Sequence, residues 1–429
     1  MDEGLLFLKR GFLMSVSGDK AVVSSAVRLP PIQQAIGGLV VLGALVMAVV
    51  MSETEENLAF LWLLAVAGGF TLQRSRFCFA SAFRDIFLFG SARTMKGIIL
   101  GLGVVTTGFA IIMHDMIPNP SFGFLPDQAH VLPVGVSTVV GGLLFGFGMV
   151  VAGGCVSGSL YRMAEGYVAS WVSVGGIVIG LGLLWQTWNW WWTNVISHEP
   201  SIWLPSVLNL GYGGGVAVTF MGLLGVFLLV LWWESRAGLF MPTLSRPENP
   251  EVSMGQKLAG LRQIVFIRGW SAAVGGAVLG GIVVLMYMTH MPWGVTGELA
   301  RLSNTAMSFF NFAAPPPLGL DSMGGCTGQG AGGGLFTHSF AVTVGLLPGS
   351  LAAALFAGEF KLRFPKNPTR YFQALGGGVL MGYGAGLAIG CTIGAFFSSI
   401  PSLSVSGWVF AVALAGGAFL GVQVIKRIP

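Results

Sequence analysis

The residues best suited to chemistry in this sequence are its cysteines, two of which lie in the same local pattern. Cys155 lies within Gly154–Gly158 and Cys391 within Gly390–Gly394, so a Gly-Cys-x-x-Gly motif occurs twice, 236 residues apart. Glycine lets a ligand or another helix approach the backbone closely. A helix that begins just after each cysteine would direct free N–H groups towards the thiol. The pattern predicts a small-anion site lined by amides and a soft thiol. The structural alternative is glycine at helix contacts and cysteine as a small buried apolar residue.

Two further cysteines lie beside breaks in apolar segments. Cys78 closely follows Arg76, and a charge inside a membrane usually marks a pathway. We therefore expect Arg76 to draw an anion in, with a purely topological role at the interface as the alternative. Cys326 precedes Cys391 by 65 residues, much as Cys78 precedes Cys155 by 77. This spacing suggests that Cys326 is the counterpart of Cys78, and we include it among the pathway residues.

Other polar groups carry weaker signals. Tyr161, Arg162 and Glu165 follow Cys155 and are interpreted as an ion pair near the membrane interface that fixes topology. No G-x-x-x-x-G-K-[ST] motif occurs, which argues against an ATP-driven motor. No H-E-x-x-H motif occurs and the five histidines are scattered, so we expect no metal or haem cofactor. The absence of a C-x-x-C pair favours free thiols.

The composition requires the elements that position these residues to be membrane helices. Of 429 residues, 54% are hydrophobic and only 9% are charged, against about 25% charged in an ordinary soluble domain. Unbroken apolar runs of 17 to 20 residues indicate spanning helices in a lipid bilayer. The net charge of +5 comes from basic residues at the ends of these runs, so nucleic-acid binding is not expected.

The apolar runs predict a topology with intact and broken spans. Intact spans are expected near 33–51, 97–113, 135–152, 168–189, 215–233, 270–289, 340–357, 371–389 and 407–425. Broken segments are expected at 57–73, 156–167 and 304–339, where a pathway could be lined. No signal peptide is recognised, and the basic loops predict cytoplasmic N- and C-termini.

The helices before the two motifs match as well, which indicates an internal repeat. Gly142–Gly148 and Gly378–Gly384 share the pattern G-x-x-x-G-x-G at the same offset. Loop charges give these two helices opposite directions, which is typical of inverted-repeat transporters. We therefore expect an all-α polytopic membrane protein in which two inverted-topology repeats with broken or re-entrant helices form a central pathway. The expected parts are a cytoplasmic segment 1–32, a peripheral helix 33–56, repeats 57–233 and 270–429, and a polar connection 234–269.

From about residue 57 to the C-terminus the chain resembles the YeeE/YedE family of bacterial sulphur-transport membrane proteins. The resemblance rests on the paired Gly-Cys motifs, the Arg-Phe-Cys78 element and the segment Phe396–Pro401. It implies thiosulfate uptake through an hourglass-shaped protein whose central thiols pass the anion along by S–H hydrogen bonds. It also implies a TusA-like cytoplasmic sulphur-carrier protein as partner. By position Cys78, Cys155 and Cys391 match the family's pathway thiols, whereas Cys326 is additional.

These observations predict a transporter of thiosulfate or a related sulphur anion in the bacterial inner membrane, and not an enzyme. The segment Phe396–Pro401 is similar to the YedE branch, which is associated with selenium metabolism, so a selenium oxyanion remains an alternative substrate. A second alternative is a membrane thiol protein whose cysteines form persulfides or disulfides with a soluble partner.

Overall fold

The computed structural model describes residues 31–120, 124–126, 128–207, 211–236, 265–266, 269–289, 291–312, 314–320, 334 and 336–427. Across these residues the chain is almost entirely helical and has only isolated β-bridges. Nine helices in this part are long and apolar enough to cross a membrane, and one further pair is bent by 47° at a short break. The predicted class, an all-α polytopic membrane protein, is confirmed.

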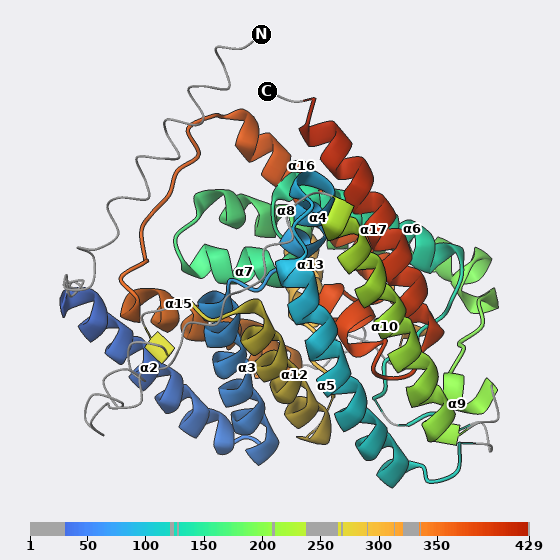
Figure 1. Cartoon of the computed structure of the whole chain (residues 1–429). Coiled ribbons are helices and arrows are strands. Elements are labelled where there is room, and N and C mark those ends of the chain that lie inside the picture. The colour runs from blue at the N-terminus through green and yellow to red at the C-terminus, as the bar shows by residue number, and fades with distance from the viewer. Residues whose placement is uncertain are drawn as a thin grey trace.

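Figure 1 shows the helices as a single bundle, with α2 at its edge. Their bounds are α2 (Pro31–Ser52), α3 (Glu56–Ser75), α4 (Phe79–Phe89), α5 (Arg93–Met116), α6 (Val136–Ala152), α7 (Val156–Ala164), α8 (Val168–Asn194), η2 (Ile196–His198), α9 (Leu204–Val207), α10 (Gly211–Arg236), α12 (Ala272–Thr289), α13 (Thr296–Phe309), α14 (His338–Val344), α15 (Leu346–Phe356), α16 (Thr369–Leu387), η6 (Thr392–Ser398) and α17 (Val405–Ile425).

The expected spans correspond to helices, but one break was not predicted. The first two broken segments fall at α3 and α7, while much of 304–339 lies outside the described residues. The unpredicted break separates α12 from α13, where the described residues 291–295 are all buried. Pro292 and Gly294 interrupt the helix there. The break therefore lies inside protein, which is where a membrane protein tolerates irregular backbone.

Glycines allow α6 and α16 to cross closely and in opposite directions. A Cβ on Gly141 would lie 2.9 Å from the Gly384 carbonyl oxygen, and one on Gly148 would lie 2.6 Å from the Gly377 carbonyl oxygen. The residue numbers of the contacts decrease along α16 as they increase along α6, so the two helices are antiparallel. No side chain larger than hydrogen fits at these points of contact.

Both helices also have a parallel neighbour. Helix α16 packs against α8, which follows the first motif, and α6 packs against α17, which follows the second. Gly180 of α8 contacts the Val379 backbone of α16, while Gly146 of α6 contacts the Leu414 backbone of α17. Figure 1 shows α17 running alongside α6. The inverted relation of the two halves and the boundaries of the predicted parts stay predictions, which superposition of the halves would test. Most of 1–32 and of 234–269 lies outside the described residues.

Candidate functional site

Two of the predicted pathway thiols lie side by side in the interior. Cys78 is the N-cap residue of α4 and Cys155 the N-cap residue of α7. Their sulfur atoms are 3.9 Å apart, and both side chains are buried. The Cys155 sulfur also accepts a hydrogen bond of 3.3 Å from the Gly158 backbone N–H. Two breaks that are distant in the sequence therefore bring two thiols together at two helix N-termini, where unpaired amides favour negative charge.

The close approach of these thiols explains one of the two glycines in the first motif. A Cβ on Gly158 would lie 2.7 Å from the Cys78 sulfur and 3.2 Å from the Cys155 sulfur. A Cβ on Gly154 would have its nearest neighbour, the Ser159 hydroxyl, at 3.4 Å, which is ordinary contact. Space at the thiol pair therefore depends on Gly158 and not on Gly154.

Cys391 has a different environment. It is the N-cap residue of η6, and backbone amides of Val295, Ile393 and Gly394 face its sulfur. In the described part of the chain no second thiol lies within hydrogen-bonding distance of it. A Cβ on Gly390 would lie 2.8 Å from the Ala395 nitrogen, so a glycine is needed there. The second motif thus presents one buried thiol among backbone donors.

The N-cap residue beside Cys391 is Val295, which begins α13. Cys78 holds the equivalent position beside Cys155. Cys326, the expected counterpart of Cys78, lies outside the described residues. Sequence reasoning missed the approach of Val295, although Pro292 and Gly294 marked the break that allows it.

An aromatic cluster joins the two broken regions. The Phe79 ring, next to Cys78, lies 5.5 Å from the Phe397 ring and 6.1 Å from the Phe396 ring. The Phe83 ring contacts Phe396 at 6.1 Å between centroids. The first turn of α4 is therefore held against η6 by edge-on ring contacts, which fixes the two regions relative to each other.

A polar cavity of about 260 Å³ contains the predicted access residue Arg76. Three arginines, two glutamates and two tyrosines line it: Arg76, Arg162, Arg363, Glu165, Glu359, Tyr161 and Tyr167. Arg76 is largely exposed and pairs with Glu359 at 3.2 Å. The cavity lies at the ends of α3 and α7 and its lining has one more positive than negative side chain, and guanidinium groups suit small anions.

Arg162 links this cavity to the thiol pair. Its guanidinium donates to the Gly153 carbonyl oxygen and to the Tyr161 hydroxyl, and its charge acts on both Cys78 and Cys155. The expected ion pair of Arg162 with Glu165 is wrong, because the described ion pairs do not include it. Sequence spacing suggested the pair, but the fold turns the guanidinium towards the helix break.

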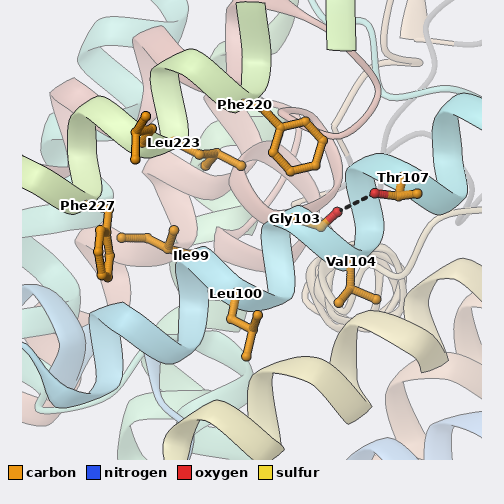
Figure 2. Close-up of a pocket in the computed structure, with 9 residues that line it drawn as sticks. Ile99, Leu100, Gly103, Val104, Thr107, Phe220, Leu223 and Phe227 are labelled. Atoms are coloured by element: carbon orange, nitrogen blue, oxygen red, sulfur yellow. Dashed lines mark hydrogen bonds between the residues drawn. The ribbon is translucent and has the colours of Figure 1, made fainter. Parts of the chain in front are cut away.

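A second, apolar hollow differs from this cavity. It has a volume of about 440 Å³ and lies between α5 and α10. Figure 2 shows residues such as Ile99, Phe220 and Phe227 on its walls. Among its described lining residues the one side-chain hydroxyl, that of Thr107, donates a hydrogen bond to the Gly103 carbonyl oxygen of the same helix. This hollow has no group that could hold an anion.

Comparison with known proteins identifies the family. The family model described as "Sulphur transport" matches residues 74–420. This chain belongs to the sulphur-transport family. A relative named thiosulfate transporter TsuA from Spirochaeta thermophila is 31% identical over 363 residues, covering 80% of this chain and 92% of that protein. The TsuA of Escherichia coli is 26% identical over 356 residues, covering 82% and 90%.

Another relative in the sulphur-transport family is the probable transporter YedE of Escherichia coli. It is 32% identical over 203 residues, which is 47% of each chain. Membership of this transporter family confirms the expectation that the chain is a multi-pass transporter and not an enzyme.

Proposed function

We propose that this protein imports thiosulfate across the bacterial inner membrane along a pathway that includes Cys78, Cys155 and Cys391. The observation that carries the proposal is the buried pair of thiols, 3.9 Å apart, at the ends of two broken helices. The relatives named thiosulfate transporter support the choice of anion. The third thiol, among backbone amides, would be a further station.

The chemistry of these groups suits thiosulfate. Its terminal sulfur is a soft and diffuse acceptor, which S–H groups and amides hold weakly enough for release. Arg162 supplies positive charge beside the thiol pair. The glycines complete the pathway by leaving room, above all at Gly158.

Loop charges support an orientation for import. The loop after α15 carries Lys361, Arg363 and Lys366, which the positive-inside rule places in the cytoplasm. The polar cavity then opens on the cytoplasmic side, and both chain termini are cytoplasmic as well. A TusA-like sulphur-carrier protein would receive the anion at this face.

Uptake by proteoliposomes tests the proposal. Purified protein is reconstituted and offered thiosulfate, sulfate, sulfite and selenite separately, and initial rates are compared. We expect thiosulfate to enter fastest, with sulfate excluded because it has no terminal sulfur. If selenite enters fastest, the substrate is a selenium oxyanion and not thiosulfate. Entry of none of the four anions would overturn the proposal.

The 3.9 Å separation of Cys78 and Cys155 also favours a second candidate, sulfur transfer through a persulfide. A cysteine thiolate would attack the outer sulfur of thiosulfate, forming a persulfide while the S–S bond breaks and sulfite leaves. Mass spectrometry after turnover distinguishes the candidates. Unmodified cysteines are expected for transport, whereas a gain of one sulfur on Cys78 or Cys155 would favour transfer.

A further inference from the structure

Two carboxylates on the cavity wall share one neutral donor. The Gln73 amide nitrogen donates to Glu165 at 2.9 Å and to Glu359 at 2.8 Å. The amide orientation is fixed because Arg74 donates to the Gln73 oxygen at 2.7 Å. The two carboxylates are therefore held near each other, and the ionisation of one disfavours that of the other.

The two carboxylates differ in their ion pairs with nearby arginines. Glu359 pairs with Arg74 at 2.9 Å and with Arg76 at 3.2 Å. Glu165 is 8% exposed and takes part in none of the ion pairs of the described residues. Burial raises the pKa of Glu165, against the opposing effects of Gln73 and Arg162. Of the two carboxylates, Glu165 is the one whose charge is less compensated by a neighbouring guanidinium.

The groups that face Glu165 come from every element around the cavity. They are Gln73, Arg74 and Arg76 at the end of α3, Tyr161 and Arg162 on α7, Tyr167 before α8, and Glu359, Lys361 and Arg363 after α15. Arg363 is fixed by stacking on Tyr167, 4.4 Å from the ring centroid, and by donating to the Glu359 carbonyl oxygen. Arg162 is held by its bonds to Gly153 and Tyr161, so the cavity wall has two guanidinium groups fixed in place and the more exposed Arg76 beside them.

We propose that this cavity is a proton-linked binding site for tetrahedral dianions, in which Glu165 becomes protonated when the anion binds between Arg162, Arg363 and Arg76. The volume of about 260 Å³ is ample for an anion of five heavy atoms with some water. The anion is attracted by the guanidinium groups and repelled by the Glu165 carboxylate. Protonation removes that repulsion, so binding of the anion and of the proton favour each other.

This site is distinct in selectivity from the thiols of the proposed function and does not depend on them. Guanidinium groups hold oxygen atoms by charge-assisted hydrogen bonds, so sulfate and thiosulfate should both bind. One linked proton makes the affinity rise about tenfold for each pH unit lowered, between the pKa of Glu165 in the empty and in the occupied cavity. Above that window the affinity is constant and weak, and below it constant and strong.

Binding of sulfate to the purified protein tests the site without relying on transport. Isothermal titration from about pH 4, near the ordinary glutamate pKa of about 4.3, to pH 8.5 gives the affinity, and two buffers of different ionisation enthalpy at each pH give the protons taken up. For the unaltered protein we expect tighter binding at lower pH and uptake of close to one proton. An affinity that does not change with pH, or binding without proton uptake, would overturn the proposal. This measurement on the unaltered protein stands even if a variant fails to fold.

Substitutions identify the residue that takes up the linked proton. Glu165→Gln should bind sulfate as tightly at high pH as the unaltered protein does at low pH, and without taking up protons. Glu234→Gln is the matched control, because Glu234 is 9% exposed but pairs with Lys96 away from the cavity. The control should keep the full pH dependence. If Glu165→Gln keeps that dependence too, Glu165 is not the proton acceptor and the proposal fails.

The test of this anion site and the test of thiosulfate transport can fail independently. Sulfate binding linked to a proton in a protein that does not take up thiosulfate would refute the transport proposal alone. Thiosulfate uptake by a protein that binds no sulfate would refute this inference alone.

Discussion

The breaks at Cys155 and Cys391 have the same sequence motif but different neighbours. Cys155 has a second thiol, Cys78, beside it and an arginine close by, whereas Cys391 has backbone amides and the Val295 N-cap. The backbone differs as well. The left-handed residue before the first motif is Gly153, with φ of 83°, and before the second it is Ile389, with φ of 56°. A β-branched residue adopts that conformation only where its surroundings impose it.

The difference suggests two kinds of station on one pathway. In the proposed pathway, the first break combines soft thiols with charge, which would attract an anion and hold it briefly. The second keeps one thiol in a charge-poor setting, with the buried Thr392 hydroxyl next to it lacking a hydrogen-bond partner among the described residues. A dianion would bind weakly there and leave readily. Substitutions at each station show whether the two are equally necessary and differently built.

The largest expected effect is loss of uptake when either motif cysteine is replaced. Cys155→Ala and Cys391→Ala should each abolish thiosulfate uptake by proteoliposomes, because a relay fails at any missing station. Removing one thiol should cost only about 1–2 kcal/mol of stability, so the variants should still fold. Serine should rescue poorly, since a hydroxyl is a harder donor. Cys326→Ala should be milder. Near-normal rates in both alanine variants would show that the cysteines only fill space.

Gly158 should matter far more than Gly154. Gly158→Ala places a Cβ against both thiols of the first station, and overpacking there should lower uptake roughly tenfold or more. Gly154→Ala is the matched control, since its Cβ meets only ordinary contacts. Initial uptake rates of the two variants are compared at equal reconstitution. Equal rates would mean that the space between Cys78 and Cys155 is not used.

A smaller effect is expected at the mouth of the polar cavity, which in the import orientation is where the anion leaves. Arg76 is 73% exposed, so it should act by long-range attraction that draws the anion from the thiols towards this mouth, and Arg76→Ala should lower uptake roughly threefold at low salt. The loss should disappear near physiological salt, because the Debye length falls from about 30 Å at 0.01 M to about 8 Å at 0.15 M. Rates are measured across that range. A loss that is the same at every ionic strength would assign Arg76 a structural role.

The second break should show a pH-dependent weakness of its own. His130 is buried, and its Nδ1 lies 3.1 Å from the Gly394 carbonyl oxygen. Burial lowers the pKa of His130 to about 4, so folding favours the neutral ring. Its contribution is complete above the ordinary pKa of about 6.5 and is lost as pH falls towards 4, about 3 kcal/mol in all. Thermal unfolding of the protein and of His130→Gln, measured at several pH values, should show a smaller decline in the variant.

The sequence was sufficient to locate the long membrane helices and both Gly-Cys motifs, but not the shorter helices α4 and α13. Apolar length and glycine spacing are local properties, so α6, α7, α16 and η6 could be located before any contact was known. Arg162 was misjudged because a spacing of three residues to Glu165 resembles an ion pair on a regular helix. The helix containing Arg162 ends at Ala164, and its guanidinium turns back to Gly153 instead.

What the sequence determined by itself is that this chain lies in a bilayer, with two cysteines at matched helix breaks. Only the tertiary structure decided which groups meet at those breaks. The pairing of Cys78 with Cys155, the approach of Val295 to Cys391 and the shared Gln73 all join residues far apart in the chain. Such contacts depend on how the helices cross, and each crossing is set by many glycine contacts acting together. No local pattern contains that information.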